Sequence, residues 1–501
     1  MEQIIELILN EFSLQLLGLI IVGASVGVIG GALPGISSTA TIALLAMFAF
    51  TMPTVHAVMF LASAQVGSTY GGSITATALN IPGTPGAAAT AIEGYPMAKR
   101  GEGNLALSVN VLSSFFGNAI GATALVVSMP LMLTIVMGFG SWEMFWFAIF
   151  GIMICASLSR GDFVKGLIAA CGGLIISFVG FDPIHGAGAV RFYFGIRHLR
   201  DGIHLIPAMV GLFGMAEVFS QFSEMKKTES AIALKKEKLF HWGAMWKYKW
   251  LLLRTSIIGF FIGLVPGVGP HVAAWVGYNH AYTTSKNKDN FGKGEVEGLV
   301  GTESSSNACA SGSFAPMLAL GIPGDGVTAV ILAVLLVQGV RTGPAFLTDN
   351  PGFMGLFWLA FMLAGVVMLL VGTLFGRAII RMLTAPLPIT LAFVVSLCAI
   401  GAFSASRRYN DIIVMFLFGL LGLAMNKNKF PIPPMILGIV VGGRLVDAYF
   451  RRAIMAGHGS FLPFVTRPFS AVLVSILVIL LFVEFVLPVI KKRRSKKEPP
   501  Q

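Results

Sequence analysis

Charged side chains are scarce in this chain: Asp, Glu, Lys and Arg together make up only 12% of its 501 residues. A soluble domain averages about 25% charged residues, so the composition excludes an ordinary soluble protein. Cysteines are also few, and Cys155, Cys171, Cys309 and Cys398 stand at scattered spacings that form neither a metal motif nor a disulfide framework. The acidic start of the chain lacks the basic region of a cleavable signal peptide, so we expect the first span to be retained.

Motifs for common enzyme chemistry are missing as well. The sequence contains no Gly-x4-Gly-Lys-Ser/Thr loop for nucleotide phosphates, so we do not expect the chain to hydrolyse ATP. Its eight histidines form no His-Glu-x-x-His pattern, and no nucleophile stands beside a base. The sequence therefore predicts that the protein is not an enzyme and has no catalytic residue, metal centre or organic cofactor.

What the chain has instead is apolar residues, which account for 55% of it. About 20 such residues in a row span a bilayer as a helix. Apolar windows of this kind occur, for example, at 109–127, 145–158, 353–374 and 469–489. The sequence therefore predicts an all-α polytopic membrane protein whose surroundings are the lipid bilayer.

The net charge of +12 is concentrated in two places rather than spread over the chain. One cluster of lysines lies at 226–249, and a second basic cluster lies in the tail at 491–497. Basic clusters beside apolar spans mark the cytoplasmic side of a membrane protein. We therefore expect a periplasmic N-terminus, a cytoplasmic linker and C-terminus, and no nucleic-acid partner.

Two unusual motifs occur twice, about half a chain apart. Gly31-Ala32-Leu33-Pro34-Gly35 recurs as Gly263-Leu264-Val265-Pro266-Gly267, an offset of 232 residues. Asn80-Ile81-Pro82-Gly83 recurs as Gly321-Ile322-Pro323-Gly324, an offset of 241 residues. Helix-breaking Pro-Gly pairs at corresponding places in two halves indicate broken helices around a shared binding site, as in transporters.

The charge pattern and the repeated motifs together predict an inverted-repeat topology. If the N-terminus is outside and the linker 221–250 is cytoplasmic, an odd number of crossings precedes the linker, and the second half enters the membrane from the other side. We expect a first membrane repeat at 1–220, a second at 251–466, and a final transmembrane helix with its basic tail at 467–501. This arrangement gives about 11–12 transmembrane segments, with broken or re-entrant helices.

The Pro-Gly motifs predict where a substrate binds. Proline lacks an N–H group and glycine accepts left-handed backbone, so a helix ends or unwinds there. Hydroxyl side chains then cap the next helix, whose free N–H groups and positive dipole end attract an anion. A single Pro-Gly pair is more simply a helix kink, whereas four pairs matched across a repeat favour a site. The candidate substrate-binding residues are Pro34, Gly35, Ser37, Ser38, Thr39, Asn80, Pro82, Gly83 and Thr84 in the first half, and Pro266, Gly267, Gly269, Pro323 and Gly324 in the second.

A second candidate site is for a coupling cation. The segment 67–77, which includes Thr75, is small and rich in hydroxyls, and unwound backbone of this kind can coordinate Na⁺. Close helix packing by small residues is the alternative interpretation. The counterpart at 301–308 contains Glu303, Ser306 and Asn307. Thr75 and these three residues are the candidate cation-coupling residues.

Glu303 carries most of the cation hypothesis. An intramembrane carboxylate costs on the order of 2.5–3.5 kcal/mol on insertion scales, so it usually has a function. It could bind a cation or a proton, or order an unwound segment; the alternative is a carboxylate at a loop edge in the interface. Asp325, just after the second Ile-Pro-Gly, is a weaker candidate of the same kind.

At several of these motifs the chain resembles the large membrane subunit of the tripartite tricarboxylate transporters, the TctA family. The resemblance covers nearly the whole chain and rests above all on Tyr70-Gly71-Gly72-Ser73-Ile74-Thr75, Asn80-Ile81-Pro82-Gly83-Thr84-Pro85-Gly86, Glu93-Gly94-Tyr95-Pro96-Met97-Ala98 and Phe291-Gly292-Lys293-Gly294. It implies a secondary transporter of the bacterial inner membrane. Such a transporter works with a small membrane subunit of about four spans and a periplasmic solute-binding protein.

The resemblance also implies a substrate class: tricarboxylates such as citrate, or related carboxylates, driven by an ion gradient that is often sodium. The chain departs from the family pattern at Glu303-Ser304-Ser305-Ser306-Asn307, at Asp325 and at Ile36-Ser37-Ser38. Because these departures lie near the predicted site, the substrate need not be citrate. The alternatives are a stand-alone ion-coupled organic anion transporter and, with less support, a channel or membrane scaffold.

Overall fold

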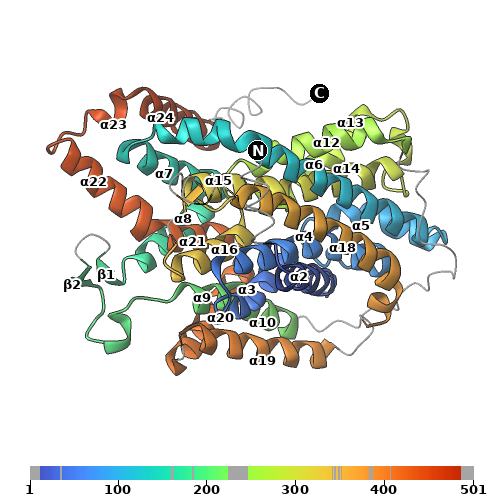
Figure 1. Ribbon diagram of the computed structural model, residues 1–501, viewed down its shortest axis with the longest axis horizontal. Helices are drawn as coiled ribbons and strands as arrows, with labels where there is room; N and C mark the ends of the chain where they lie inside the picture. Colours follow the sequence, from blue (N-terminus) through green and yellow to red (C-terminus); the bar gives the residue numbers. More distant parts are fainter. Residues whose placement is uncertain are drawn as a thin grey trace, which may run out of the picture. The chain divides into compact units, whose positions relative to one another are not determined.

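The computed structural model describes residues 12–33, 36–158, 163–182, 186–223, 246–340, 342–343, 346–347, 350, 352–382, 387–406 and 408–486. Helices dominate these residues, and the one sheet among them is a two-stranded ribbon (Figure 1). The chain divides into two compact units. Unit 1 comprises Met1–Leu133 and His204–Asn428, and unit 2 comprises Thr134–Ile203 and Lys429–Gln501.

Unit 1 contains most of the long helices, and α6 (Gly103–Met137) begins in it and ends in unit 2. Its other elements are α2 (Leu14–Ala32), α3 (Ser38–Ala49), α4 (Thr54–Leu79), α5 (Ala87–Lys99), α9 (Leu205–Met209), the π-helical segment η2 (Val210–Met215), α10 (Ala216–Ser223), α12 (Lys249–Gly263), α13 (Gly269–Thr284), the short η3 (Lys288–Asn290), α14 (Val296–Gly312), α15 (Phe314–Leu320), α16 (Gly326–Val337), α18 (Phe353–Met382), α19 (Leu387–Ser406) and α20 (Tyr409–Lys427).

Unit 2 combines helices with the small antiparallel ribbon. Gly180 pairs with Arg191 and Phe181 with Val190, and the register shifts before Asp182. The elements of the unit are α7 (Ser141–Leu158), α8 (Phe163–Ser177), β1 (Gly180–Asp182), β2 (Gly186–Arg191), η1 (Arg197–Leu199), α21 (Ile432–Val441), the π-helical segment η4 (Gly442–Asp447), α22 (Ala448–Ala456), α23 (Pro463–Thr466), α24 (Pro468–Leu481) and the π-helical segment η5 (Phe482–Val486).

The predicted polytopic membrane fold is confirmed. Six described helices are long and apolar enough to cross a membrane, and a seventh span results if the bent pair Ile432–Val441 and Leu445–Ala456 is counted as one. The predicted 11–12 segments would have to include five shorter apolar helices of 10–17 residues. The six long spans are Leu14–Ala32, Gly103–Met137, Leu205–Phe222, Phe353–Gly376, Tyr409–Lys427 and Pro468–Phe485.

Two hydroxyl-rich helices, α4 and α14, are buried along almost their whole length in unit 1. Several of their hydroxyls bond within the helix: Ser63 donates to the carbonyl of Met59 at 2.6 Å, and Thr302 donates to that of Gly298 at 2.8 Å. Back-bonding of this kind lets Ser and Thr sit inside a buried helix. The expectation of unwound backbone at 67–77 is therefore wrong, because α4 stays helical to Leu79.

Close glycine packing joins α2 to α4, which lie side by side (Figure 1), and α12 to α14. A Cβ atom built on Gly27 would lie 2.2 Å from the oxygen of Ala64, so only glycine fits there. A Cβ atom on Gly259 would lie 2.1 Å from the oxygen of Ser305. One turn further on, the equivalent contacts are Gly31 with the oxygen of Ser68 (2.2 Å) and Gly263 with that of Cys309 (2.5 Å).

These packing contacts recur with the offsets of the sequence motifs. Gly259 follows Gly27 by 232 residues, and Ser305 follows Ala64 by 241 residues. The order of helices also recurs, and each half ends in a helix with a π-helical segment, η2 or η4. The division into repeats at 1–220 and 251–466 and the inversion of the second copy both stay predictions, which these parallels favour.

We expect Gly27→Val and Gly259→Val to destabilise the protein to a similar degree. Each change forces side-chain atoms against a backbone carbonyl that cannot move independently, and overpacking of this kind costs about 3 kcal/mol. The midpoint temperature of unfolding in nanodiscs would measure both effects. Gly18→Val is the matched control, because a Cβ atom on Gly18 of α2 meets nothing within 4 Å. A loss confined to one of the two variants would contradict equivalent packing in the two halves.

Candidate functional site

The structure breaks a helix at both copies of the Ile-Pro-Gly motif. α4 ends at Leu79, and Asn80 takes the left-handed conformation with φ 55°. α15 ends at Leu320, and Gly321 takes the same conformation with φ 70°. Left-handed residues commonly end helices in this way. The chain then leaves the helix before α5 and α16 begin.

The other repeated motif also lies at a break. α12 ends at Gly263 and α13 begins at Gly269, and both Gly267 (φ 84°) and Gly269 (φ 73°) are left-handed. In the first half, α2 ends at Ala32 and α3 begins at Ser38. Pro34 and Gly35, the predicted centre of that break, lie outside the described residues.

The described parts of the four breaks meet in a closed ring within unit 1, which we call the junction ring (residues 31–33, 36–39, 80–86, 263–271 and 321–326). Each break touches the next through glycine, where the absence of a side chain allows close approach. Between the first two breaks, a Cβ atom built on Gly83 would lie 2.2 Å from the oxygen of Gly31, and between the second and third, one on Gly86 would lie 3.3 Å from the Cα of His271. The third and fourth breaks are joined by a hydrogen bond from the N–H of Gly267 to the oxygen of Gly324 at 2.8 Å. Between the fourth and first, a Cβ atom on Gly326 would lie 2.9 Å from the Oγ1 of Thr39.

A helix begins at each part of the junction ring, and two of these helix starts are capped by side chains. Ser37 accepts the N–H of Ala40 at 3.1 Å and caps α3. Asp325 accepts the N–H of Thr328 at 2.7 Å and forms a capping box at the start of α16. Asp325, a candidate for cation or proton binding, thus has a structural role as an N-cap.

The other two helix starts, those of α5 and α13, have no side-chain cap. Their N-cap residues are Gly86 and Val268, and neither supplies a side-chain acceptor. These two starts are in contact with each other, through Gly86 and His271. Two adjoining positive dipole ends without side-chain caps are suited to an anion. The N–H groups of Ala87 and Ala89 donate to the carbonyls of Thr84 and Gly86, and Pro270 removes one donor from α13, so an anion would be bound by the remaining N–H groups and the two dipoles.

Apart from Pro34 and Gly35, which lie outside the described residues, every predicted substrate-binding residue lies in the junction ring. Ser37, Ser38 and Thr39 are half-buried at the start of α3, and Asn80 and Pro82 are exposed. The remaining ones are Gly83 and Thr84 in the first half and Pro266, Gly267, Gly269, Pro323 and Gly324 in the second, all buried except the half-buried Gly267.

Glu303 of α14 is buried, with 2% of its surface exposed. One carboxylate oxygen accepts the hydroxyls of Ser73 and Thr90, each at 2.5 Å, and the other accepts the hydroxyl of Ser114 at 2.9 Å. The donors come from α4, α5 and α6, so four helices meet at this carboxylate. All three donors are neutral, and no cationic side chain of the described residues is paired with the carboxylate. A buried charge without such a partner is costly.

The other predicted cation-coupling residues lie in two places. Ser306 and Asn307 follow Glu303 by one turn of α14, and the amide N–H of Asn307 donates to the backbone oxygen of Glu303 at 3.0 Å. The side-chain oxygen of Asn307 is buried and has no hydrogen-bond partner among the described residues. Thr75 instead donates to the carbonyl of Gly72 at 3.0 Å, next to the break that follows α4.

A second buried carboxylate, Glu93 of α5, holds the loop between α13 and α14. It accepts the hydroxyl of Tyr278 at 2.7 Å and the backbone N–H groups of Gly292 (2.6 Å), Gly294 (2.7 Å) and Glu295 (2.7 Å). The sequence comparison singled out both segments, 93–98 and 291–294, without assigning a role to Glu93. In the structure they form one contact between the two halves of the chain.

We expect Glu93→Gln to loosen this loop. An amide group accepts at only one atom, so donors of the loop lose charge-assisted hydrogen bonds that contribute about 1.5–3 kcal/mol each. Hydrogen exchange of the 288–297 segment should become faster. Glu217→Gln is the control, because Glu217 of α10 accepts from Gln221 of its own helix and is not part of the loop. Equal exchange rates in the loop of both variants would contradict the role of Glu93.

Comparisons with known proteins show the family of the chain. The model of the tripartite tricarboxylate transporter TctA family matches residues 17–437. An uncharacterized 52.8 kDa protein from the TAR-I ttuC' 3' region of Agrobacterium vitis is 33% identical over 481 residues, covering 95% of this chain and 94% of the relative. An uncharacterized protein from the TAR-II ttuC' 3' region of the same organism is 32% identical over 241 residues, covering 48% of this chain and 98% of the relative. No solved structure matches.

Proposed function

Because the chain belongs to the tripartite tricarboxylate transporter TctA family, we propose that it is the large permease subunit of a binding-protein-dependent secondary transporter. In this proposal it imports tricarboxylates or related carboxylates across the bacterial inner membrane, driven by a cation gradient. Its partners are a small membrane subunit of about four spans and a periplasmic solute-binding protein. The N-terminus is periplasmic, the C-terminus is cytoplasmic, and the two membrane repeats are inverted relative to each other.

The observation that carries the proposal is the meeting of the uncapped starts of α5 and α13 in the junction ring. A substrate carboxylate placed there accepts backbone N–H groups that have no side-chain cap, and it is stabilised by two helix dipoles. Broken helices from both halves are the usual way in which secondary transporters build such a site. The left-handed glycines of the α12–α13 break keep the backbone open to the ligand.

The coupling cation is assigned to Glu303. Within the described part of the chain, its carboxylate has three neutral hydroxyl donors and no cationic partner, and the side-chain oxygen of Asn307, one turn away, has no hydrogen-bond partner there. A bound cation, with sodium as the first candidate, neutralises the carboxylate and uses the surrounding oxygens as ligands. Proton binding to Glu303 is the alternative form of the same coupling.

α5 connects the two sites. Its first residues adjoin the start of α13, and Thr90, in its first turns, donates to Glu303. A change in the charge of Glu303 therefore acts directly on the helix whose start holds the substrate. Coupling requires that the two ligands favour the same conformation, and a shared helix provides the connection.

The test is uptake of labelled citrate into proteoliposomes that contain this chain, the small subunit and the binding protein. We expect saturable uptake that needs all three components and stops when the sodium gradient is removed. Uptake without the binding protein would instead identify a stand-alone transporter. Flux that neither saturates nor depends on an ion gradient would identify a channel and contradict the proposal.

A further inference from the structure

We propose that residues 192–200 of unit 2, which we call the aromatic loop, form the surface on which the periplasmic solute-binding protein docks. The inference rests on the proposed function, since it assumes a tripartite transporter. It goes beyond that function by naming the surface and its chemistry. The loop follows β2 and precedes the span Leu205–Phe222.

The aromatic loop exposes large apolar side chains at its tip. Phe194 is 76% exposed, Phe192 57%, Ile196 52% and Tyr193 40%. Contiguous exposed apolar groups of this kind mark interaction sites. Aromatic residues together with arginine are also the residues most often found at the energetic centre of protein interfaces.

The backbone of the loop is held in an unusual conformation. Phe192 (φ 49°) and Phe194 (φ 51°) are both left-handed, which is uncommon for bulky residues. Such conformations persist where the surrounding structure fixes them, and they cluster at functional sites. Within the loop, the N–H of Ile196 donates to the carbonyl of Tyr193 at 2.8 Å and so closes the turn that displays the aromatic rings.

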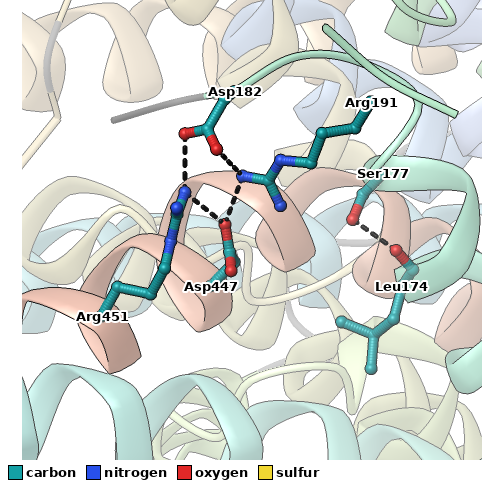
Figure 2. A network of polar contacts seen from close by, with 6 residues as sticks. All are labelled: Leu174, Ser177, Asp182, Arg191, Asp447 and Arg451. Carbon is teal, nitrogen blue, oxygen red and sulfur yellow. Dashed lines mark hydrogen bonds and ion pairs between the residues drawn. The ribbon is translucent and has the colours of Figure 1, made fainter. Parts of the chain in front are cut away.

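Four charged residues fix the base of the loop (Figure 2). Asp182 of β1 binds Arg191 of β2 at 2.8 Å and Arg451 of α22 at 2.6 Å. Asp447 binds the same two arginines, at 2.9 and 3.1 Å. The strand that leads into the loop is thereby tied to a helix of the same unit. A pre-organised surface loses little freedom on binding, which favours a protein partner of defined shape over a fluid lipid surface.

The order of spans along the chain puts the aromatic loop on the periplasmic side. One candidate span, Leu205–Phe222, separates it from the lysine-rich linker, which is cytoplasmic in the proposed topology. A second count starts from the basic tail. One span, Pro468–Phe485, separates that tail from α22, whose Arg451 binds the base of the loop. The two counts agree, and they use different basic clusters.

The charge of the loop indicates the chemistry of the partner. Arg197, His198 and Arg200 are exposed, and residues 192–200 contain no acidic side chain. The structure therefore fits a protein surface with an apolar pocket for Phe194 beside a cluster of carboxylates. Attraction between such surfaces speeds association and weakens with salt.

The experiment titrates the fluorescently labelled binding protein of the same transporter onto this chain and its small subunit in nanodiscs. We expect Phe194→Ser and Arg197→Ser each to raise the dissociation constant about tenfold, as loss of an interface anchor does. Binding to the wild-type complex should also weaken as salt is raised. Phe222→Ser is the matched control, because Phe222 is 59% exposed at the other end of the adjacent span.

Unchanged affinity in both loop variants overturns the docking surface and leaves the proposed function intact. Failure of the binding protein to stimulate citrate uptake by the wild-type complex would instead overturn the proposed function, and the docking surface with it. A Phe194→Trp variant separates protein from membrane. Measured as the difference from the wild type, whose seven tryptophans give a background, the fluorescence of the new residue should respond to the binding protein and not to brominated lipids; additional quenching by those lipids identifies a membrane anchor and overturns the proposal.

Discussion

Glu303→Gln is expected to lower gradient-driven uptake by about a hundredfold, the order that follows from losing one or two charge-assisted interactions of about 1.5–3 kcal/mol each. Glutamine keeps the size of the side chain but removes the charge that a cation needs. It also turns an NH₂ group toward hydroxyls that now donate to a carboxylate. Initial rates of citrate uptake with and without a sodium gradient would measure the loss.

The variant should retain exchange of citrate across the membrane without a gradient, because the start of α5 is intact. This separates loss of coupling from loss of folding. Glu297→Gln is the matched control, since Glu297 lies in the first turn of the same helix. A sodium response in Glu303→Gln equal to that of the wild type would remove Glu303 from the coupling role.

Gly267→Val is expected to abolish uptake and exchange together. The φ of Gly267 is 84°, a region in which a β-branched residue is strained, and its N–H donates to Gly324 in the junction ring at 2.8 Å. Relief of the strain requires the α12–α13 break to move, and α13 supplies one of the two uncapped helix starts. A shift of about 1 Å in a binding geometry can cost on the order of a hundredfold in rate.

The amount of Gly267→Val in the membrane should be close to that of the wild type, because the change is local to the break. Gly376→Val provides a control in the same unit, since a Cβ atom on Gly376 meets nothing within 4 Å. Full transport by Gly267→Val would show that this break does not form the substrate site.

The positions of the helix breaks were predictable from sequence, because Pro and Gly act on the backbone locally. Asn80 and Gly321 end their helices at the equivalent places that the repeated motif indicates. The segment 67–77 was not predictable in the same way. Its glycines and hydroxyls look like unwound backbone, whereas in the folded helix Gly67 and Gly71 pack against α2 and the hydroxyl of Thr69 bonds to the carbonyl of Gln65.

The surroundings of Glu303 also could not be obtained from sequence. Ser73, Thr90 and Ser114 lie on three helices, and hydroxyl residues are common throughout these helices. Which of them reach the carboxylate depends on how the helices pack. The role of Glu93 was also hidden in the sequence, because three of its four donors are backbone N–H groups, which no side-chain identity reveals.

The central claim is that a substrate carboxylate binds where the uncapped starts of α5 and α13 meet. The most direct measurement is an experimental structure of the complete transporter in lipid, determined with saturating citrate and sodium. The account predicts citrate density in the junction ring, within hydrogen-bonding distance of backbone N–H groups at the start of α5. Citrate bound away from the junction ring, with the starts of α5 and α13 in contact as they are here, would contradict it.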